Sequence, residues 1–174
     1  MSASLQYTIG KFNAPEQIDA IQLRLYIQDI EDFPMLLRKE LEKLKDKELD
    51  KAYRPGGWTI RQVVHHCADS HMNSFIRFKL ALTEENPHIK PYLEHLWAES
   101  VDYLEMPVSF SLSILEGLHA RWVCLLESLT EKDLKRTFFH PQMGKNIPLD
   151  RNIALYSWHC RHHLAHVQSI RKKK

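Results

Sequence analysis

Apolar residues recur at intervals of three and four along four stretches of the sequence, a spacing typical of helices that bury one face. The first predicted helix runs from Glu16 to about Lys47. Pro34 lies inside it and cannot donate a backbone hydrogen bond, so we expect either a kink there or a new helix with Asp32 as its N-cap. The apolar stripe of this helix comprises Ile18, Ile21, Leu25, Ile30, Phe33, Leu37, Leu41 and Leu44.

The second predicted helix has the clearest start signal in the chain. Gln62 follows Thr59 by three residues, which is the pattern of a capping box, and Trp58 and Val63 have the spacing of a hydrophobic staple. We therefore expect this helix to begin at Thr59, and its broad apolar arc extends to about Thr83.

Two more helices are predicted in the second half of the chain. The third runs from about Ser111 to Leu129, and the fourth begins with Asp150 as its N-cap and runs to about Ile170. Between them, Thr130 and Asp133 predict a short capped turn.

The connections complete the predicted architecture. Residues 84–109 contain three prolines and cannot form one helix, and a connection of this length is usually a crossover or functional. Residues 137–149 predict a small hairpin about Gly144, and residues 2–15 an extended arm lying on the domain. The predicted fold is all-α, a four-helix bundle with a long crossover connection and a small hairpin before the last helix. Such bundles often hold metals between facing helices.

Composition narrows the class of protein. The length of 174 residues favours one domain, residues 1–174, and the content of 44% hydrophobic and 26% charged residues excludes the disordered class. A formal charge of +2, with one dense basic run at Arg171 to Lys174, gives no support to nucleic-acid binding. There is no long apolar run and no signal-peptide core, so we expect no membrane association and a cytoplasmic location. The odd number of cysteines suits a reducing compartment: Cys67, Cys124 and Cys160.

The eleven histidines are the unusual feature, because four of them lie within the nine residues from Trp158 to His166. On a helix, His159 and His163 are one turn apart at the flank of the apolar arc and can hold one metal ion, whereas His162 and His166 fall further round. The pair lacks the glutamate of an HExxH motif, so a set of hydrogen-bonded histidines on a partly exposed helix is the alternative.

A third ligand is expected from the second helix, where His65 and His66 lie on opposite sides of the apolar arc. The helical wheel does not decide between them. We favour His66 because Ser70 and Ser74 beside it are small and allow a facing helix to approach closely. His71 falls within the apolar arc and is expected to be a hydrogen-bonded core histidine.

Three neutral imidazoles suit Zn²⁺ or Ni²⁺ and leave a coordination position open, which is the mark of a catalytic site. Such a centre can activate water for hydrolysis or deprotonate a thiol for thiol transfer. Asp69 is a candidate acceptor for an imidazole N–H, and His119 and Trp122 are candidates to line the mouth of the site. The cysteines next to the histidines, Cys67 and Cys160, point about 100° away from them and are expected to be buried hydrophobic residues.

Several blocks of sequence resemble a known family. They are R-P-G-G-W-T-I-R-Q-V-V-H-H from Arg54, A-D-S-H-M-N-S-F-I-R-F-K-L from Ala68, W-H at Trp158 and H-H-L-A-H from His162. Together they resemble the DinB/YfiT-like superfamily, in particular its YfiT-type metal-dependent hydrolases, over nearly the whole chain. The resemblance implies a four-helix bundle with an unusual crossover topology, a divalent metal held by three histidines, and a homodimer.

The resemblance implies that the ligands are His66, His159 and His163. The superfamily that the chain resembles also includes thiol-dependent S-transferases that use bacillithiol or mycothiol. We therefore expect a metalloenzyme with one divalent ion per chain, zinc first and nickel second, that acts on a small-molecule substrate as a hydrolase. The alternatives are an S-transferase that uses a low-molecular-weight thiol, and a metal-binding bundle without catalysis. No catalytic residue is assigned beyond the ligands.

Overall fold

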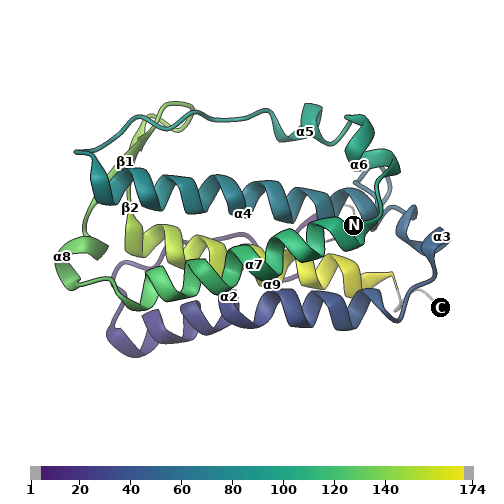
Figure 1. Ribbon diagram of the computed structural model, residues 1–174, viewed down its shortest axis with the longest axis horizontal. Coiled ribbons are helices and arrows are strands. Elements are labelled where there is room, and N and C mark those ends of the chain that lie inside the picture. Colours follow the sequence, from purple (N-terminus) through teal and green to yellow (C-terminus); the bar gives the residue numbers. More distant parts are fainter. Residues whose placement is uncertain (1–4, 171–174) are drawn as a thin grey trace.

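Four long helices form the molecule, as the computed structural model shows for residues 5–170 (Figure 1). The predicted all-α bundle is confirmed. The basic run at 171–174 and the first residues of the predicted arm lie outside the described range. The four helices are α2 (Ala20–Leu41), α4 (Ile60–Thr83), α7 (Val108–Glu127) and α9 (Leu149–Ser169). None of the helices within the described range is long and apolar enough to span a bilayer.

The order of the helices around the bundle differs from their order in the chain. Helix α2 packs against α7 and α9, and α4 packs against the same two helices from the opposite corner. In Figure 1, α2 and α9 run in one direction and α4 and α7 in the other. Neighbouring helices that run parallel cannot be joined by a tight turn, so this topology requires long connections.

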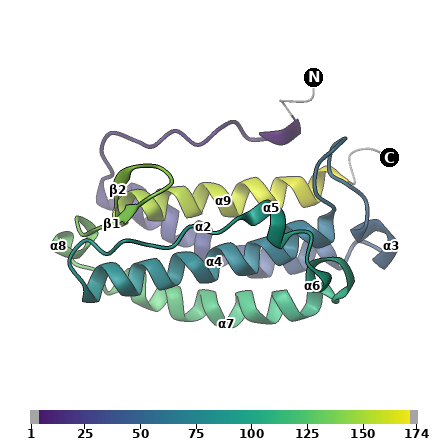
Figure 2. The ribbon, with the colours of Figure 1, turned by 90° about the horizontal axis from the view of Figure 1, so that it is seen from above.

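The first long connection returns along α4 after that helix ends (Figure 2). It contains the short helices α5 (Glu94–Trp97) and α6 (Val101–Glu105). The predicted crossover between residues 84 and 109 is therefore present, and it brings the chain back to the end of the bundle where α7 begins.

The second long connection holds α8 (Glu131–Leu134) and the predicted hairpin, in which β1 (Thr137–His140) pairs antiparallel with β2 (Lys145–Pro148). Gly144 has a φ of +62° at its turn, a conformation that glycine adopts without strain. The backbone N–H of Ile89 donates to the carbonyl of Phe139 at 3.1 Å, so the hairpin is attached to the first long connection.

The start of α4 matches the predicted capping box. The backbone N–H of Gln62 donates to Thr59 Oγ1 at 3.2 Å, and the backbone N–H of Thr59 donates to Gln62 Oε1 at 2.9 Å. This box fixes the first turn of α4, and so the direction in which His66, nearly two turns after Thr59, leaves the helix.

Three expectations about helix ends and faces were wrong. Helix α2 begins at Ala20, after the cap Asp19, rather than at Glu16, and ends at Leu41 rather than near Lys47. It continues through Pro34 without restarting at Asp32. Ile21 and Leu25 are 75% and 57% exposed, because the stripe that faces the core at this end of α2 consists of Leu23, Tyr26 and Ile27. Helix α9 begins at Leu149, so Asp150 lies in its first turn rather than at its cap. A short helix, α3 (Asp46–Leu49), precedes α4.

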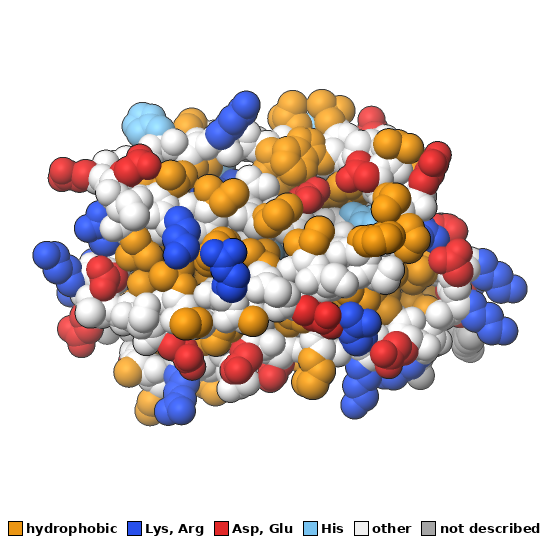
Figure 3. Space-filling model, viewed as in Figure 1, with side chains coloured by type: hydrophobic (Ala, Val, Ile, Leu, Met, Phe, Trp, Pro, Cys, Tyr) orange, Lys and Arg blue, Asp and Glu red, His pale blue; other side chains and the backbone are white. Residues whose placement is uncertain are grey.

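The segment before α2 lies along α9, as expected for the predicted arm (Figure 2). Residues 5–9 form a helical turn, so this part of the arm is not extended as predicted. Trp158 Nε1 donates to the carbonyl of Gly10 at 3.1 Å, and the ring of Phe12 packs 6.1 Å from that of Trp158. The surface seen in Figure 3 carries hydrophobic side chains over α5 and α6, which are exposed in the single chain.

Candidate metal centre

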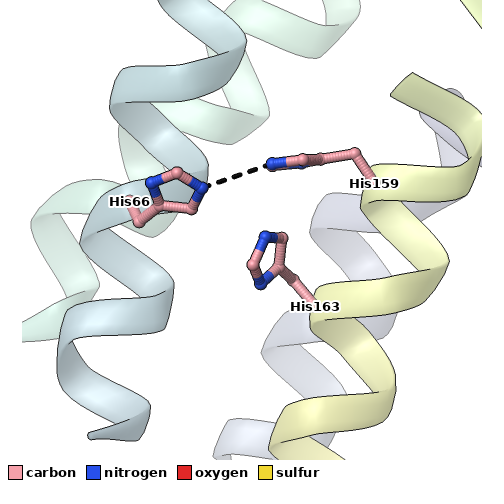
Figure 4. Close-up of side chains that lie close together, drawn as sticks. All are labelled: His66, His159 and His163. Atoms are coloured by element: carbon pink, nitrogen blue, oxygen red, sulfur yellow. Dashed lines mark hydrogen bonds between the residues drawn. The ribbon is translucent and has the colours of Figure 1, made fainter. Parts of the chain in front are cut away.

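Three histidines converge from two facing helices (Figure 4). His66 extends from α4, and His159 and His163 extend from successive turns of α9. One ring nitrogen of each lies within 4.8 Å of the others, and the Nε2 atoms of His66 and His159 are 3.3 Å apart. The structure thus brings together the three residues that the sequence singled out.

The three imidazoles are neutral at physiological pH. Burial, followed by the charge of His162, lowers the pKa of His66 to about 3. Burial also holds the pKa values of His159 and His163 well below the ordinary range, and the neighbouring histidines lower them further. Neutral imidazole nitrogens keep their lone pairs, so these rings are available as ligands.

The arrangement fits a divalent ion of borderline softness. Two nitrogens bound at about 2.0–2.1 Å to one tetrahedral zinc ion are about 3.3 Å apart, and this is the separation of the two Nε2 atoms. Within residues 5–170, no hydrogen bond to a carboxylate occupies any of the three rings, and the Nδ1 atoms of His66 and His163 are buried without a partner. His159 is partly buried, whereas His66 and His163 are buried.

His65 forms hydrogen bonds away from the metal centre, although the helical wheel did not exclude it as a ligand. Its Nε2–H donates to the carbonyl of Met106 at 3.1 Å, and its Nδ1 accepts from Ser111 Oγ at 2.7 Å. Both ring nitrogens are therefore used to join α4 to the start of α7. His66 is the histidine of this pair that faces α9.

Two buried hydroxyl groups, those of Ser70 and Tyr156, lie next to His159. Ser70 Oγ lies 3.5 Å from His159 Nε2 and 3.1 Å from Tyr156 Oη, and Tyr156 Oη donates to the carbonyl of Ser70 at 3.0 Å. On the other side, the indole of Trp58 packs 4.8 Å from the ring of His66. One wall is thus polar and the other apolar.

His162 and His166 are buried, although the helical wheel places them further round from the apolar arc than His159 and His163. The cause is the N-terminal segment and the loop before α4, which cover them. His166 Nε2–H donates to the carbonyl of Gln6 at 3.1 Å, and Tyr53 stacks on His166 with ring centroids 3.9 Å apart.

His162 and His166 form a second group of closely spaced nitrogens with His163. All three members belong to one helix, and two of them are consecutive and leave it in different directions. Their rings lie 5.0 and 5.4 Å from that of His163, so they hold its orientation by packing.

The predicted surroundings of the site need two corrections. Asp69 accepts from the hydroxyl of Tyr103 at 2.6 Å and orients no imidazole. His119 and Trp122 do not line the mouth, because both are fully buried behind the site. The hydrogen-bond partner of His159 Nδ1 is instead His71 Nε2, at 3.0 Å. The sequence signal for this contact was the position of a polar ring in the middle of an apolar arc, which requires a buried partner.

The expectation for the two cysteines beside the ligands agrees with the structure. Cys67 and Cys160 are buried in the core, and burial raises the pKa of both thiols. A buried thiol with a raised pKa stays protonated and acts as a small hydrophobic residue.

Comparisons with known proteins show which proteins the chain is similar to. The model of the DinB superfamily matches residues 29–167. A relative from Oceanobacillus iheyensis is 51% identical over 97% of this chain and 97% of its own, and one from Bacillus cereus is 54% identical over 97% and 96%. Both are named "Putative metal-dependent hydrolase".

A solved structure has the same fold. YfiT from Bacillus subtilis superimposes with a TM-score of 0.95 at 46% identity, covering 98% of this chain and 97% of its own. It is described as "a probable metal-dependent hydrolase with an unusual four-helix bundle topology".

Proposed function

The chain belongs to the DinB superfamily, and from this premise we propose that it is a hydrolase in which His66, His159 and His163 hold one divalent metal ion per chain. The observation that carries the proposal is the convergence of three neutral imidazoles from α4 and α9. The names of the relatives support metal dependence and hydrolysis as the class of chemistry.

The residues around the site have different roles in the proposed reaction. The three imidazoles supply lone pairs and no charge, so they would leave the positive charge of a bound cation uncompensated. A divalent ion held by these residues would lower the pKa of a water molecule to about 7 and would supply hydroxide at neutral pH. The hydroxyls of Ser70 and Tyr156 lie beside His159 and can hold an oxygen of a small-molecule substrate. Trp58 limits access from the apolar side.

We propose zinc as the ion, with nickel second. Imidazole nitrogen binds both, and no thiolate or carboxylate belongs to the group formed by these three histidines. Three protein ligands leave at least one position free, as in catalytic rather than structural zinc sites.

The first test is metal content. Tag-free protein would be analysed by plasma mass spectrometry, alongside the double variant His159→Ala/His163→Ala. The matched control is His88→Ala/His95→Ala, which removes two exposed histidines. We expect one metal per chain in the wild type and the control, and none in the ligand variant. Absence of metal from the wild type after addition of Zn²⁺ and Ni²⁺ would refute the metal site.

The second test separates the activities open to such a site. Metal-loaded wild type and His159→Ala/His163→Ala would be assayed with nitrophenyl esters, with amides, and with an electrophile plus a low-molecular-weight thiol. Hydrolysis that depends on the two histidines supports the proposal. Turnover only with the thiol would reassign the protein as an S-transferase, and binding of metal without turnover would make it a non-catalytic metal-binding bundle.

A further inference from the structure

A chain of hydrogen bonds leads from the candidate metal centre across the whole bundle. His159 on α9 contacts His71 on α4, with Nδ1 and Nε2 3.0 Å apart. His71 Nδ1 lies 2.7 Å from Nε2 of His119 on α7. His119 Nδ1 lies 2.6 Å from the backbone carbonyl oxygen of Ile30 on α2. Each of the four helices therefore contributes one member, and the two middle rings are fully buried.

The last member of the chain is available because of a proline. In a regular helix, the carbonyl of Ile30 would accept the backbone N–H of the residue four positions later. That residue is Pro34, which has no N–H, and α2 continues through it. The carbonyl of Ile30 thus lacks its helical donor inside the bundle, and His119 supplies one.

The carbonyl gives the chain a direction. A carbonyl oxygen only accepts, so His119 Nδ1 must carry the proton. A buried imidazole with no acidic partner is neutral and has a single N–H, so His119 Nε2 is bare and accepts from His71 Nδ1–H. By the same step, His71 Nε2 is bare and accepts from His159 Nδ1–H. The Nε2 of His159 is then left with its lone pair.

We propose that Pro34, through the carbonyl of Ile30, sets the tautomers of His119, His71 and His159, and so directs the Nε2 lone pair of His159 at the metal centre. His71 and His119 are positioning residues, because they act through His159 and do not reach the metal site. The inference rests on the proposed metal site for its purpose, but the tautomers exist without a metal.

The same chain of hydrogen bonds also determines which ring nitrogens carry protons in the metal-free site. His159 Nε2 is bare and lies 3.3 Å from His66 Nε2, so His66 Nε2 carries a proton and donates it to His159 when no ion is present. The metal-free protein should therefore contain three histidines of the Nδ1–H form in one chain and the opposite tautomer at His66. This contrast within one molecule provides an internal reference.

Nuclear magnetic resonance measures these tautomers directly. Long-range ¹H–¹⁵N spectra of histidine-labelled, chelator-treated protein at neutral pH distinguish Nδ1–H from Nε2–H, and single variants assign the signals. We expect the Nδ1–H form for His71, His119 and His159 in the wild type. An Nε2–H form, or a doubly protonated ring, at any of the three would overturn the inference whether or not the protein binds metal.

Variants at the end of the hydrogen-bond chain away from the metal centre test the direction of its hydrogen bonds. His119→Leu removes the acceptor for His71, and we expect Nε2–H signal at His159 together with a 10- to 100-fold weaker affinity for Zn²⁺ in calorimetric titration. Pro34→Ala restores a backbone donor to the carbonyl of Ile30 and should cause a smaller change of the same kind. The control is Trp122→Phe, which alters a neighbouring buried ring whose Nε1 has no hydrogen-bond partner.

A conservative replacement separates positioning from packing. His71→Gln keeps an amide oxygen that can accept from His159 Nδ1–H, whereas His71→Leu does not. We expect His71→Gln to retain the His159 tautomer and most of the Zn²⁺ affinity that His71→Leu loses. Equal losses in both, or altered tautomers in Trp122→Phe, would assign these residues a packing role only. Correct tautomers in a wild type that binds no Zn²⁺ would uphold the chain and refute the proposed function.

Discussion

His65 and His66 are consecutive on α4, yet their imidazoles contact different helices. His65 is hydrogen-bonded to Ser111 of α7 and to the carbonyl of Met106, whereas His66 faces His159 of α9. Successive residues leave a helix about 100° apart, so one residue of the pair joins α4 to α7 and the other points at the candidate metal centre.

Separate substitutions of this pair should have opposite effects. His65→Ala leaves Ser111 and the carbonyl of Met106 without their partner, so we expect a loss of about 1–3 kcal/mol in the free energy of unfolding, with Zn²⁺ binding retained. His66→Ala should abolish Zn²⁺ binding and remove one buried nitrogen that has no partner. Urea denaturation of the chelator-treated variants and Zn²⁺ titration measure both quantities. Loss of Zn²⁺ binding in His65→Ala alone would contradict the assignment.

Periodicity and capping predicted most of the fold. The Thr59 capping box and the hairpin at Gly144 depend on neighbours in sequence, and both appear as expected. One error occurred where a segment distant in the sequence determines which side chains are buried. His162 and His166 are buried because the N-terminal segment covers α9, and a wheel drawn for one helix cannot include that segment.

The candidate site, too, could be predicted where it depends on residues close together in the sequence. The spacing of His159 and His163 indicated a pair on one helix face. The helical wheel left His65 and His66 undecided, and only the small residues beside His66 favoured it. The contact of His71 with His159 was missed, because His71 was considered only as a core residue. A hydrogen bond between residues 88 positions apart depends on how two helices face each other.

Zinc should stabilise the folded protein. An ion that binds only the folded chain adds about 2.7 kcal/mol to the free energy of unfolding at a free concentration 100 times its dissociation constant. We expect the melting temperature to rise on addition of Zn²⁺ and to fall again with a chelator, and His163→Ala should abolish the response. Equal shifts in the wild type and His163→Ala would indicate binding elsewhere.

The metal-free protein should lose stability as the pH falls. Burial lowers the pKa of His119 to about 4 and that of His66 to about 3, whereas a histidine in the unfolded chain titrates at about 6.5. Between these values the unfolded state binds protons that the folded state does not. The free energy of unfolding should therefore fall by about 1.4 kcal/mol per pH unit for each such histidine below pH about 6.5.

Urea denaturation at several pH values between about 7.5 and 4.5 would measure this slope. The variant His119→Gln lacks one of the titrating groups. The change of its free energy of unfolding with pH should therefore be smaller, by up to about 1.4 kcal/mol per pH unit. Stability that does not change with pH in this window would show that these imidazoles are not kept neutral in the folded state.

The capping box of α4 can be weighed by one substitution. Thr59→Ala removes the acceptor for the backbone N–H of Gln62, and we expect a loss of about 1 kcal/mol in the free energy of unfolding. Thr83→Ala, at the exposed end of the same helix, is the control and should change stability by less than about 0.5 kcal/mol. Equal effects at the two ends would remove the special role of the box.

The family resemblance predicts a homodimer, and the apolar surface over α5 and α6 is where we expect the second copy (Figure 3). Leu96 of α5 and Val101 of α6 are exposed there in the single chain. Sedimentation velocity should give twice the chain mass for the wild type and the chain mass for Leu96→Glu/Val101→Glu. Met35→Glu, at an exposed apolar position on α2, is the control. A wild type that sediments at the mass of one chain would contradict the prediction.

The parallel packing of α2 and α9 has a consequence for how fast the chain folds. Ser157 on α9 donates to Asp29 on α2 at 2.5 Å across a sequence separation of 128 residues. Contacts of this range form only after a large loop has closed, and the entropy of that closure opposes the transition state. We expect the chain to fold more slowly than an up-and-down bundle of equal length, in which each helix meets its successor through a short turn.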